Sequence, residues 1–322
     1  MNADYVKGLH PIGDGHYAYL QPTGTWGYSN AGLVVDGDQS LLVDTLFDER
    51  LTAEMLAEMQ RATAIGAGDV TTLVNTHANG DHTYGNRLVA NAEIIASAAS
   101  AAEMLETPPE QMAAILQMAP QLGEVGEFLL EHFSDFDFAG VTMRPPTRTF
   151  EGRLDLRVGD EQVELIEVGP AHTAGDVIVH VPADRVVYTG DILFIEGTPL
   201  MWSGPVQKWI DACDRIIGLG ATMIVPGHGP LTDAAGVAKM RGYLEFVRAE
   251  SRQRFDAGMP AFEAALDITH PEYDQWLDAE RIVVNVDRLY REFSSEHVIA
   301  DVATSFAQMA QLRRMKYPRA GR

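Results

Sequence analysis

THANGDH, residues 76–82, directly follows the apolar run at residues 70–74, which predicts a buried strand. Within six residues it carries the imidazoles of His77 and His82, the carboxylate of Asp81 and a carboxamide. A loop at the end of a strand can turn such side chains toward one point, whereas a regular strand sends adjacent residues to opposite faces. The stretch therefore indicates a metal-binding loop, and the alternative is a polar turn that holds its histidines by chance.

Three further segments each place one metal-ligand type of residue beside a glycine at the end of a predicted strand. They are GPAHTAG around His172, YTGDILF around Asp191 and VPGHGP around His228. Glycine lets the backbone approach a bound group closely, and sites in α/β proteins lie at such strand ends. We therefore expect all four segments to meet in one site.

The pattern around these loops predicts an α/β layered fold. Two apolar runs flank Asp36-Gly37-Asp38, which is typical of a hairpin. A helix is predicted from Asp48, as its N-cap, to about Thr63. Strands are predicted at 33–35, 41–43, 70–74, 93–96, 149–158, 162–168, 177–181, 186–188 and 222–225, with a short helix at 86–91 and a longer one at 206–217.

Two stretches interrupt or follow this rhythm with helical composition. Residues 98–138 predict a helical insertion, and the chain from 232 onward is almost wholly helical. We assign residues 1–240 to the catalytic domain and 241–322 to a helical C-terminal extension packed on it. The insertion is expected to form a cap over the site that sets substrate size, and the alternative is a helical pair packed away from the site.

Composition narrows the classes of partner and compartment. The 322 residues carry a net charge of −22, from 46 acidic and 24 basic residues, which disfavours nucleic acid and anionic membrane surfaces. The single cysteine, Cys213, allows no intrachain disulfide, and residues 1–15 show no signal-peptide pattern. We therefore expect a cytoplasmic protein with a small-molecule substrate, and a homodimer is the one protein partner left open.

In their order and spacing, the four segments resemble the motifs of the metallo-β-lactamase superfamily, over roughly residues 20 to 235. The Asp191 and His228 segments are similar to its glyoxalase-II-like and lactonase-like branches. The resemblance implies an αββα sandwich with a metal site at one edge. It assigns His77, Asn79 and His172 to a first metal position, Asp81, His82 and His228 to a second, Asp191 to a bridge between them, and Asp44 to hydrogen bonds that orient the ligands.

Asn79 departs from this family, which usually has histidine there. A carboxamide oxygen is a weaker ligand than an imidazole. Two outcomes stay open. Either the second position binds one ion tightly while the first fills weakly, or Asn79 coordinates a metal or steers a metal-bound water in a binuclear site. Zn²⁺ is the expected cofactor, with one or two ions per chain, and Fe and Mn are alternatives.

The resemblance also implies a hydrolase that uses metal-activated water on an ester, thioester, lactone or amide, with Asp81 moving the proton. No Gly-x-Ser-x-Gly motif is present, which argues against a covalent serine mechanism. A second reading is a mononuclear iron oxidoreductase that resembles persulfide dioxygenases, and a third is a non-catalytic binding protein. Trp26 and Trp202 are candidates for substrate contact, against a packing role.

Overall fold

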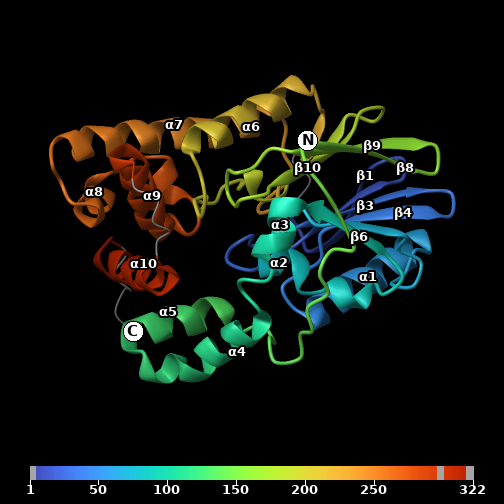
Figure 1. Ribbon diagram of the computed structural model, residues 1–322, viewed down its shortest axis with the longest axis horizontal. Coiled ribbons are helices and arrows are strands. Elements are labelled where there is room, and N and C mark those ends of the chain that lie inside the picture. Colours follow the sequence, from blue (N-terminus) through green and yellow to red (C-terminus); the bar gives the residue numbers. More distant parts are fainter. Residues whose placement is uncertain (1–4, 296–300, 317–322) are drawn as a thin grey trace.

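The computed structural model describes residues 5–295 and 301–316. Two β-sheets pack face to face, with α6 (Val206–Gly218) and α7 (Ala234–Asp256) over one and α1 (Glu49–Thr63) under the other (Figure 1). Buried aliphatic side chains from both sheets form the layer between them. The expected αββα sandwich is confirmed.

The strands of the first sheet run in sequence order, from β1 to β7, in the described part of the chain. Strands up to β4 pair antiparallel, and β4, β5, β6 and β7 pair parallel. The parallel strands therefore present their carboxyl ends at one edge. Their bounds are β1 Gly8–Gly13, β2 His16–Leu20, β3 Ala31–Asp36, β4 Gln39–Val43, β5 Thr72–Val74, β6 Glu93–Ser97 and β7 Arg148–Phe150.

The second sheet has the order β12-β11-β10-β9-β8 among the same residues. Only β11 and β12 pair parallel within it. Its strands are β8 Arg153–Val158, β9 Glu161–Glu167, β10 Val177–Val181, β11 Val186–Tyr188 and β12 Met223–Val225.

The prediction of a single strand at residues 149–158 is wrong. Residues 149–158 form two strands, β7 and β8, which belong to different sheets. Gly152 between them has a φ of 68°, a left-handed conformation that glycine adopts without strain, and its amide donates to the Glu167 carboxylate. The chain therefore crosses from one sheet to the other at this glycine. The short helix expected at 86–91 is a single 3₁₀ turn, Asn86–Leu88.

Helix α1 begins where the sequence predicted, because Asp48 accepts a hydrogen bond from the Leu51 amide as its N-cap. Its apolar face, which includes Met55 and Met59, is buried under the first sheet. The remaining α-helices are α2 Gly80–Thr83, α3 Ala98–Glu103, α4 Pro109–Met118, α5 Gly123–Phe133, α8 Ala261–Asp267, α9 Ile282–Ser294 and α10 Val302–Lys316.

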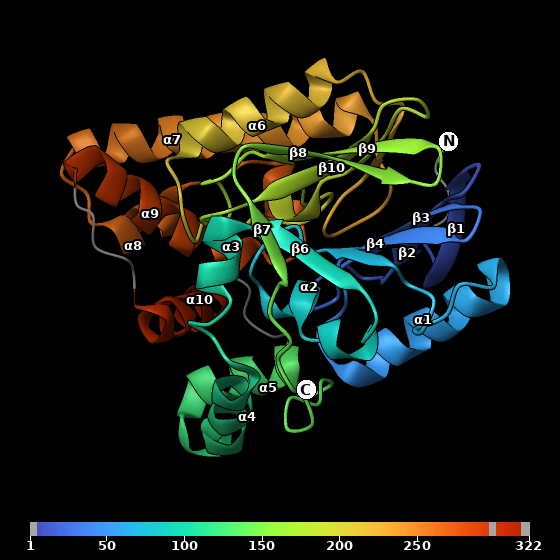
Figure 2. The same cartoon turned by 45° about the vertical axis from the view of Figure 1, so that its right-hand side comes forward.

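The insertion and the C-terminal helices lie together at one end of the sandwich, where α5 packs on α10 (Figures 1 and 2). Helix α7 is continuous from 234 to 256, so the boundary expected after residue 240 falls inside a helix and not in a linker. No described helix has the length and apolar character needed to cross a membrane.

Candidate metal centre

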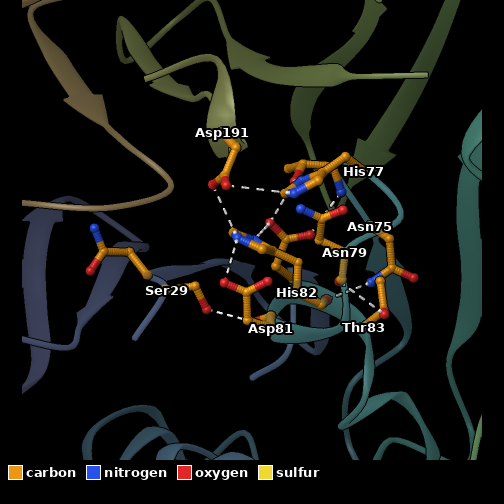
Figure 3. A network of polar contacts seen from close by, with 12 residues as sticks. Ser29, Asn75, His77, Asn79, Asp81, His82, Thr83 and Asp191 are labelled. Atoms are coloured by element: carbon orange, nitrogen blue, oxygen red, sulfur yellow. Dashed lines mark hydrogen bonds and ion pairs between the residues drawn. The ribbon is translucent and has the colours of Figure 1, made fainter. Parts of the chain in front are cut away.

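The candidate ligands come from loops and short helices at one edge of the sandwich. His77 and Asn79 follow β5, and Asp191 follows β11 in the 3₁₀ turn η3 (Gly190–Ile192). His228 follows β12, and His172 precedes β10. Asp81 and His82, expected in a loop, lie on the one-turn helix α2. Figure 3 shows the imidazoles of His77 and His82 pointing toward Asp191, whereas the side chain of Asn75 points away.

Four of these residues form a compact group. The His228 Nε2 atom lies 3.3 Å from Asp81 Oδ2 and 3.4 Å from Asp191 Oδ2. The His82 Nε2 atom lies 3.1 Å from Asp191 Oδ1 and 3.8 Å from Asp81 Oδ2. All four side chains are buried. These are the residues that the family resemblance assigned to the second metal position, together with the bridging Asp191.

The donor set fits a metal ion. His77 Nε2, His82 Nε2 and Asp191 Oδ1 are buried and have no hydrogen-bond partner in the part of the chain that the structure describes. Ligand atoms of these three residues lie within 4.8 Å of one another, as do those of Asp81, His82 and His228. Buried polar atoms are almost always paired, and Zn²⁺ binds nitrogen and oxygen at about 2.0–2.2 Å. A cation among these atoms would satisfy them.

Asp44 lies where the resemblance placed it, directly behind the ligands. Its Oδ2 atom is 2.9 Å from His82 Nδ1, and its two oxygens accept hydrogen bonds from the amide and hydroxyl of Thr76, both at 2.7 Å. A carboxylate accepts only, so His82 Nδ1 carries a proton and Nε2 is the nitrogen that can offer a lone pair to a metal. Asp44 therefore orients His82 and fixes its tautomer.

Thr76 orients His77 in the same way. Its hydroxyl donates to Asp44, so it accepts from His77 Nδ1, 3.0 Å away. The His77 Nε2 lone pair is thereby directed at the site, 3.7 Å from Asp191 Oδ2. The residue just before the first histidine thus positions it, a role of Thr76 that the sequence pattern does not indicate.

His172 and Asn79 contact each other. The Leu200 carbonyl lies 2.6 Å from His172 Nδ1, so that nitrogen carries the proton. The Asn79 Nδ2 atom lies 3.0 Å from His172 Nε2. The Ser203 amide also donates to the His172 carbonyl, so residues 200–203 hydrogen-bond both the ring and the backbone of this histidine. The sequence did not reveal Leu200, because a backbone carbonyl leaves no signature in the side chains.

Opposite charges set the proton affinities of the cluster. Burial alone would raise the pKa of Asp191, but His228 and His82 beside it hold that pKa well below its usual value. Burial alone would lower the pKa of His228, but Asp191 and Asp81 raise it to about 9. The same balance of burial against carboxylates raises the pKa of His82. A negative potential that favours protons also favours a metal cation.

Three neighbours of the ligands were not predicted from the sequence. Phe194 stacks on His228, with ring centroids 5.1 Å apart and planes 3° from parallel. The Ser29 hydroxyl donates to the Asp81 carbonyl at 2.5 Å, and the Asn75 amide donates to the His82 carbonyl at 3.0 Å. Ser29 and Asn75 fix the backbone of α2. Phe194 lies in the quoted segment around Asp191, which was its only signal.

The beginning of the insertion also braces the site. The hydroxyls of Ser97 and Ser100 both donate to the Gly175 carbonyl, and the Glu103 carboxylate accepts from the Ala174 amide. Gly175 and Ala174 belong to the loop that carries His172. Helix α3 therefore supports that loop, while the cap expected from residues 98–138 stays a prediction.

The two candidate tryptophans have different surroundings. Trp26 is buried among Phe128, Phe133 and Phe306, so its contacts join the insertion to α10. Trp202 is partly buried within the 200–203 segment that clasps His172. The contacts of Trp26 are packing contacts, and the substrate contacts expected of both residues stay predictions.

A family model described as the metallo-beta-lactamase superfamily matches residues 24–228. The chain belongs to this superfamily. The resemblance drawn from the four segments is therefore confirmed. The superfamily includes hydrolases and binds metals, and the histidine and aspartate clusters described above are consistent with that chemistry.

Individual relatives match mostly in part. The chain is 33% identical over 90 residues to the 2,4-dinitroanisole O-demethylase subunit alpha of Nocardioides sp., a match that covers 26% of each protein. It is 36% identical over 81 residues to the hydroxyacylglutathione hydrolase of Mesorhizobium japonicum, covering 25% of this chain and 31% of that enzyme. A longer match, 23% identical over 274 residues, covers 84% of this chain and 80% of the Beta-lactamase-like protein 2 homolog of Caenorhabditis elegans.

Solved structures show the same fold. The stereoselective inverting sec-alkylsulfatase Pisa1 from Pseudomonas sp. aligns with a TM-score of 0.66 at 13% identity, over 89% of this chain and 50% of that one. The metallo-beta-lactamase from Pontibacter korlensis aligns with a TM-score of 0.54 at 19% identity, over 74% of this chain and 98% of that one. At these identities the likeness concerns the fold alone.

Proposed function

We propose that this protein is a metal-dependent hydrolase that cleaves an ester, thioester, lactone or amide bond in a small molecule. One observation carries the proposal: the unpaired atoms His77 Nε2, His82 Nε2 and Asp191 Oδ1 converge at the edge of the sandwich. Membership of a superfamily that contains hydrolases supports it. Zn²⁺ is the metal that we propose, with Fe and Mn as alternatives.

The residues around such an ion have distinct tasks. A bound Zn²⁺ lowers the pKa of water to about 7 and polarises a carbonyl group. Burial opposes ionisation of Asp81, but His82 and His228 beside it lower its pKa to about 2, so this carboxylate is charged at neutral pH. An ionised carboxylate at this position can accept a proton from attacking water and return it to the leaving group. Asp44 keeps His82 in the tautomer whose lone pair faces the site.

The test compares metal-free protein with protein reloaded with Zn²⁺, Mn²⁺ or Fe²⁺ on a panel of chromogenic esters, thioesters, lactones and amides. We expect activity only after reloading, and its loss in Asp81→Asn. The matched control is His10→Gln, which changes a histidine on β1 whose side chain hydrogen-bonds the Val6 carbonyl, away from the metal centre. Equal hydrolysis by the metal-free and reloaded proteins would rule out a metal-dependent mechanism.

The iron oxidoreductase reading needs His77, His172 and Asp191 as its ligand set. In the structure, His172 Nε2 is engaged by Asn79, which leaves that set one nitrogen short. Oxygen consumption by the iron-loaded protein with a persulfide substrate, in the absence of hydrolysis, would favour this second reading over ours.

The proposal also covers the class of substrate, the cellular location and the partners of the protein. The net charge of −22 supports a small-molecule substrate over nucleic acid or an anionic membrane. The single Cys213 is consistent with a cytoplasmic location. We propose in addition that residues 98–138 influence substrate size, since α3 holds the loop of His172. Self-association is open to measurement by sedimentation.

A further inference from the structure

The two halves of the metal centre differ in which lone pairs are free. His172 resembles His77 and His82 in being buried and in having its Nδ1 proton held, here by the Leu200 carbonyl. Unlike theirs, its Nε2 atom faces a hydrogen-bond donor, the side-chain amide of Asn79 at 3.0 Å. The lone pair that a metal would need at the first position is therefore already used.

The orientation of the Asn79 carboxamide follows from its neighbour. Because His172 Nδ1 donates to Leu200, His172 Nε2 carries no proton and can only accept. An NH₂ group facing it makes a hydrogen bond, whereas the carboxamide oxygen in the same place would oppose two lone pairs. The amide oxygen of Asn79 is thus turned away from the ring and does not replace the missing imidazole as a ligand.

Within the part of the chain that the structure describes, the second metal position has no hydrogen-bond donor of the kind that Asn79 provides to His172. Among the described residues no group outside this set donates to His82 Nε2 or Asp191 Oδ1, which lie 3.1 Å apart. The Asp81 and His228 side chains complete a group of four within 3.1–3.8 Å of one another where paired. His77 contributes a free lone pair on the other side of Asp191, but it has lost His172 as a co-ligand. A single imidazole with a shared carboxylate makes a weak site.

We propose that this chain retains one tightly bound divalent ion, held by Asp81, His82, Asp191 and His228, and that the hydrogen bond from Asn79 to His172 prevents a second ion from being retained beside His77. The sequence left this outcome and a binuclear centre equally open. The proposal rests on the proposed metal-dependent function, but it concerns the number of ions and not the reaction.

The experiment counts ions without using activity. Protein stripped with a chelator is titrated with Zn²⁺ and with Co²⁺, desalted, and measured by elemental mass spectrometry, while absorption of bound Co²⁺ reports its coordination. We expect one ion per wild-type chain and a rise toward two in Asn79→His. The control Asn91→His adds an imidazole at an exposed loop asparagine, so it tests for adventitious binding and should stay at one.

Two further variants separate the halves. His172→Ala should keep the tight ion, with its Kd changed by no more than about 100-fold, because loss of an indirect partner typically costs 10–100-fold and loss of a ligand costs more. His228→Ala should lose it. Two equally tight ions in the wild type, or loss of the tight ion in His172→Ala, would overturn the proposal. Absence of any bound ion in folded wild-type protein would overturn the proposed function as well.

Discussion

The metal centre and a second buried cluster, at the 3₁₀ turn η5 (Ala279–Arg281), both hold charged side chains away from water, but their unpaired atoms differ in kind. At the metal centre the unpaired atoms discussed above are lone pairs that point at one place. At the η5 cluster, formed by Asp278, Glu280, Arg281 and Trp26, the atoms without a hydrogen-bond partner among the described residues are two donors, Arg281 Nε and Trp26 Nε1, and two acceptors, Asp278 Oδ2 and Glu280 Oε1. Only the first arrangement suits a single cation.

The contacts of the η5 cluster join residues that are distant in the sequence and so stabilise the fold. The Arg281 guanidinium lies 4.1 Å from the centre of the Trp26 ring, 3.0 Å from an Asp278 oxygen, and donates to the Thr198 carbonyl. The Thr25 hydroxyl donates to Asp278 at 2.6 Å. Burial of charge alone therefore does not mark a ligand site; the direction and type of the unpaired atoms do.

Asp191→Ala should separate the two clusters most strongly. We expect hydrolysis to fall by several orders of magnitude, because without the metal the pKa of water returns from about 7 to about 15.7. The fold should persist, because Asp191 contributes a buried charge that the ion is expected to neutralise, and the variant loses the charge and the ion together. The measurements are kcat/KM, metal content and far-UV circular dichroism, and normal metal content in this variant would contradict our assignment.

Arg281→Met should have the opposite profile. Removing one partner of a buried pair leaves Asp278 without its cation, which costs about 3–5 kcal/mol of the free energy of unfolding. The folded fraction should still bind metal. The control is Arg252→Met on α7, an arginine that is half exposed and pairs with Asp256, where we expect a much smaller loss because solvent screens an exposed pair. Urea unfolding measures both, and equal losses would refute the structural role.

His132, which packs against Trp26, should make stability depend on pH. Burial lowers its pKa from 6.5 to about 4, although Asp278 opposes the shift, and Arg313 adds to it. The unfolded chain therefore binds the proton first, so stability is full above about pH 6.5 and declines as the pH falls to about 4, by up to about 3 kcal/mol. His132→Gln should flatten that decline in urea unfolding at several pH values. An unchanged slope would show that His132 does not titrate as described.

Asp44→Asn tests the orientation of the metal ligands. We expect metal affinity to fall by about 10–100-fold, because partners of a ligating histidine typically contribute that much, while the Thr76 amide keeps an acceptor. Calorimetric metal titration measures the effect. Asp38→Asn, at an exposed hairpin turn, is the control and should leave the affinity unchanged. Equal affinities of Asp44→Asn and wild type would remove Asp44 from the site.

Phe194→Leu should have the smallest effect, and it probes the residue that the clusters share. Phe194 stacks on His228, and Arg281 lies 5.7 Å from its ring centre. Loss of the stacking should cost about 0.5–1.5 kcal/mol beyond the lost area and weaken metal binding a few-fold. Phe255→Leu, another packed aromatic that is remote from the site, should lower stability alone. Identical metal affinities for both variants would leave Phe194 with a packing role only.

Much of the site could be predicted because its ligands lie in short segments that follow strands. The segment THANGDH and the loops of His172, Asp191 and His228 indicate both the types of ligand residue and the edge of the sandwich that they share. The insertion and the helical end were visible from composition. The split at Gly152 was not, because an apolar alternation on both sides of one glycine predicts a single strand equally well. Phe194 gave no separate signal, since a phenylalanine after a strand is ordinary.

By itself, the sequence determined the superfamily, the layered fold and the set of candidate ligands, because these depend on residue types at local spacings. Only the tertiary structure decided which lone pairs are free. The Leu200 carbonyl reaches His172 across 28 residues of chain, and Asn79 reaches it across 93. Hydrogen bonds over such separations depend on how the two sheets pack, so no local pattern records whether Asn79 binds a metal or its neighbouring histidine.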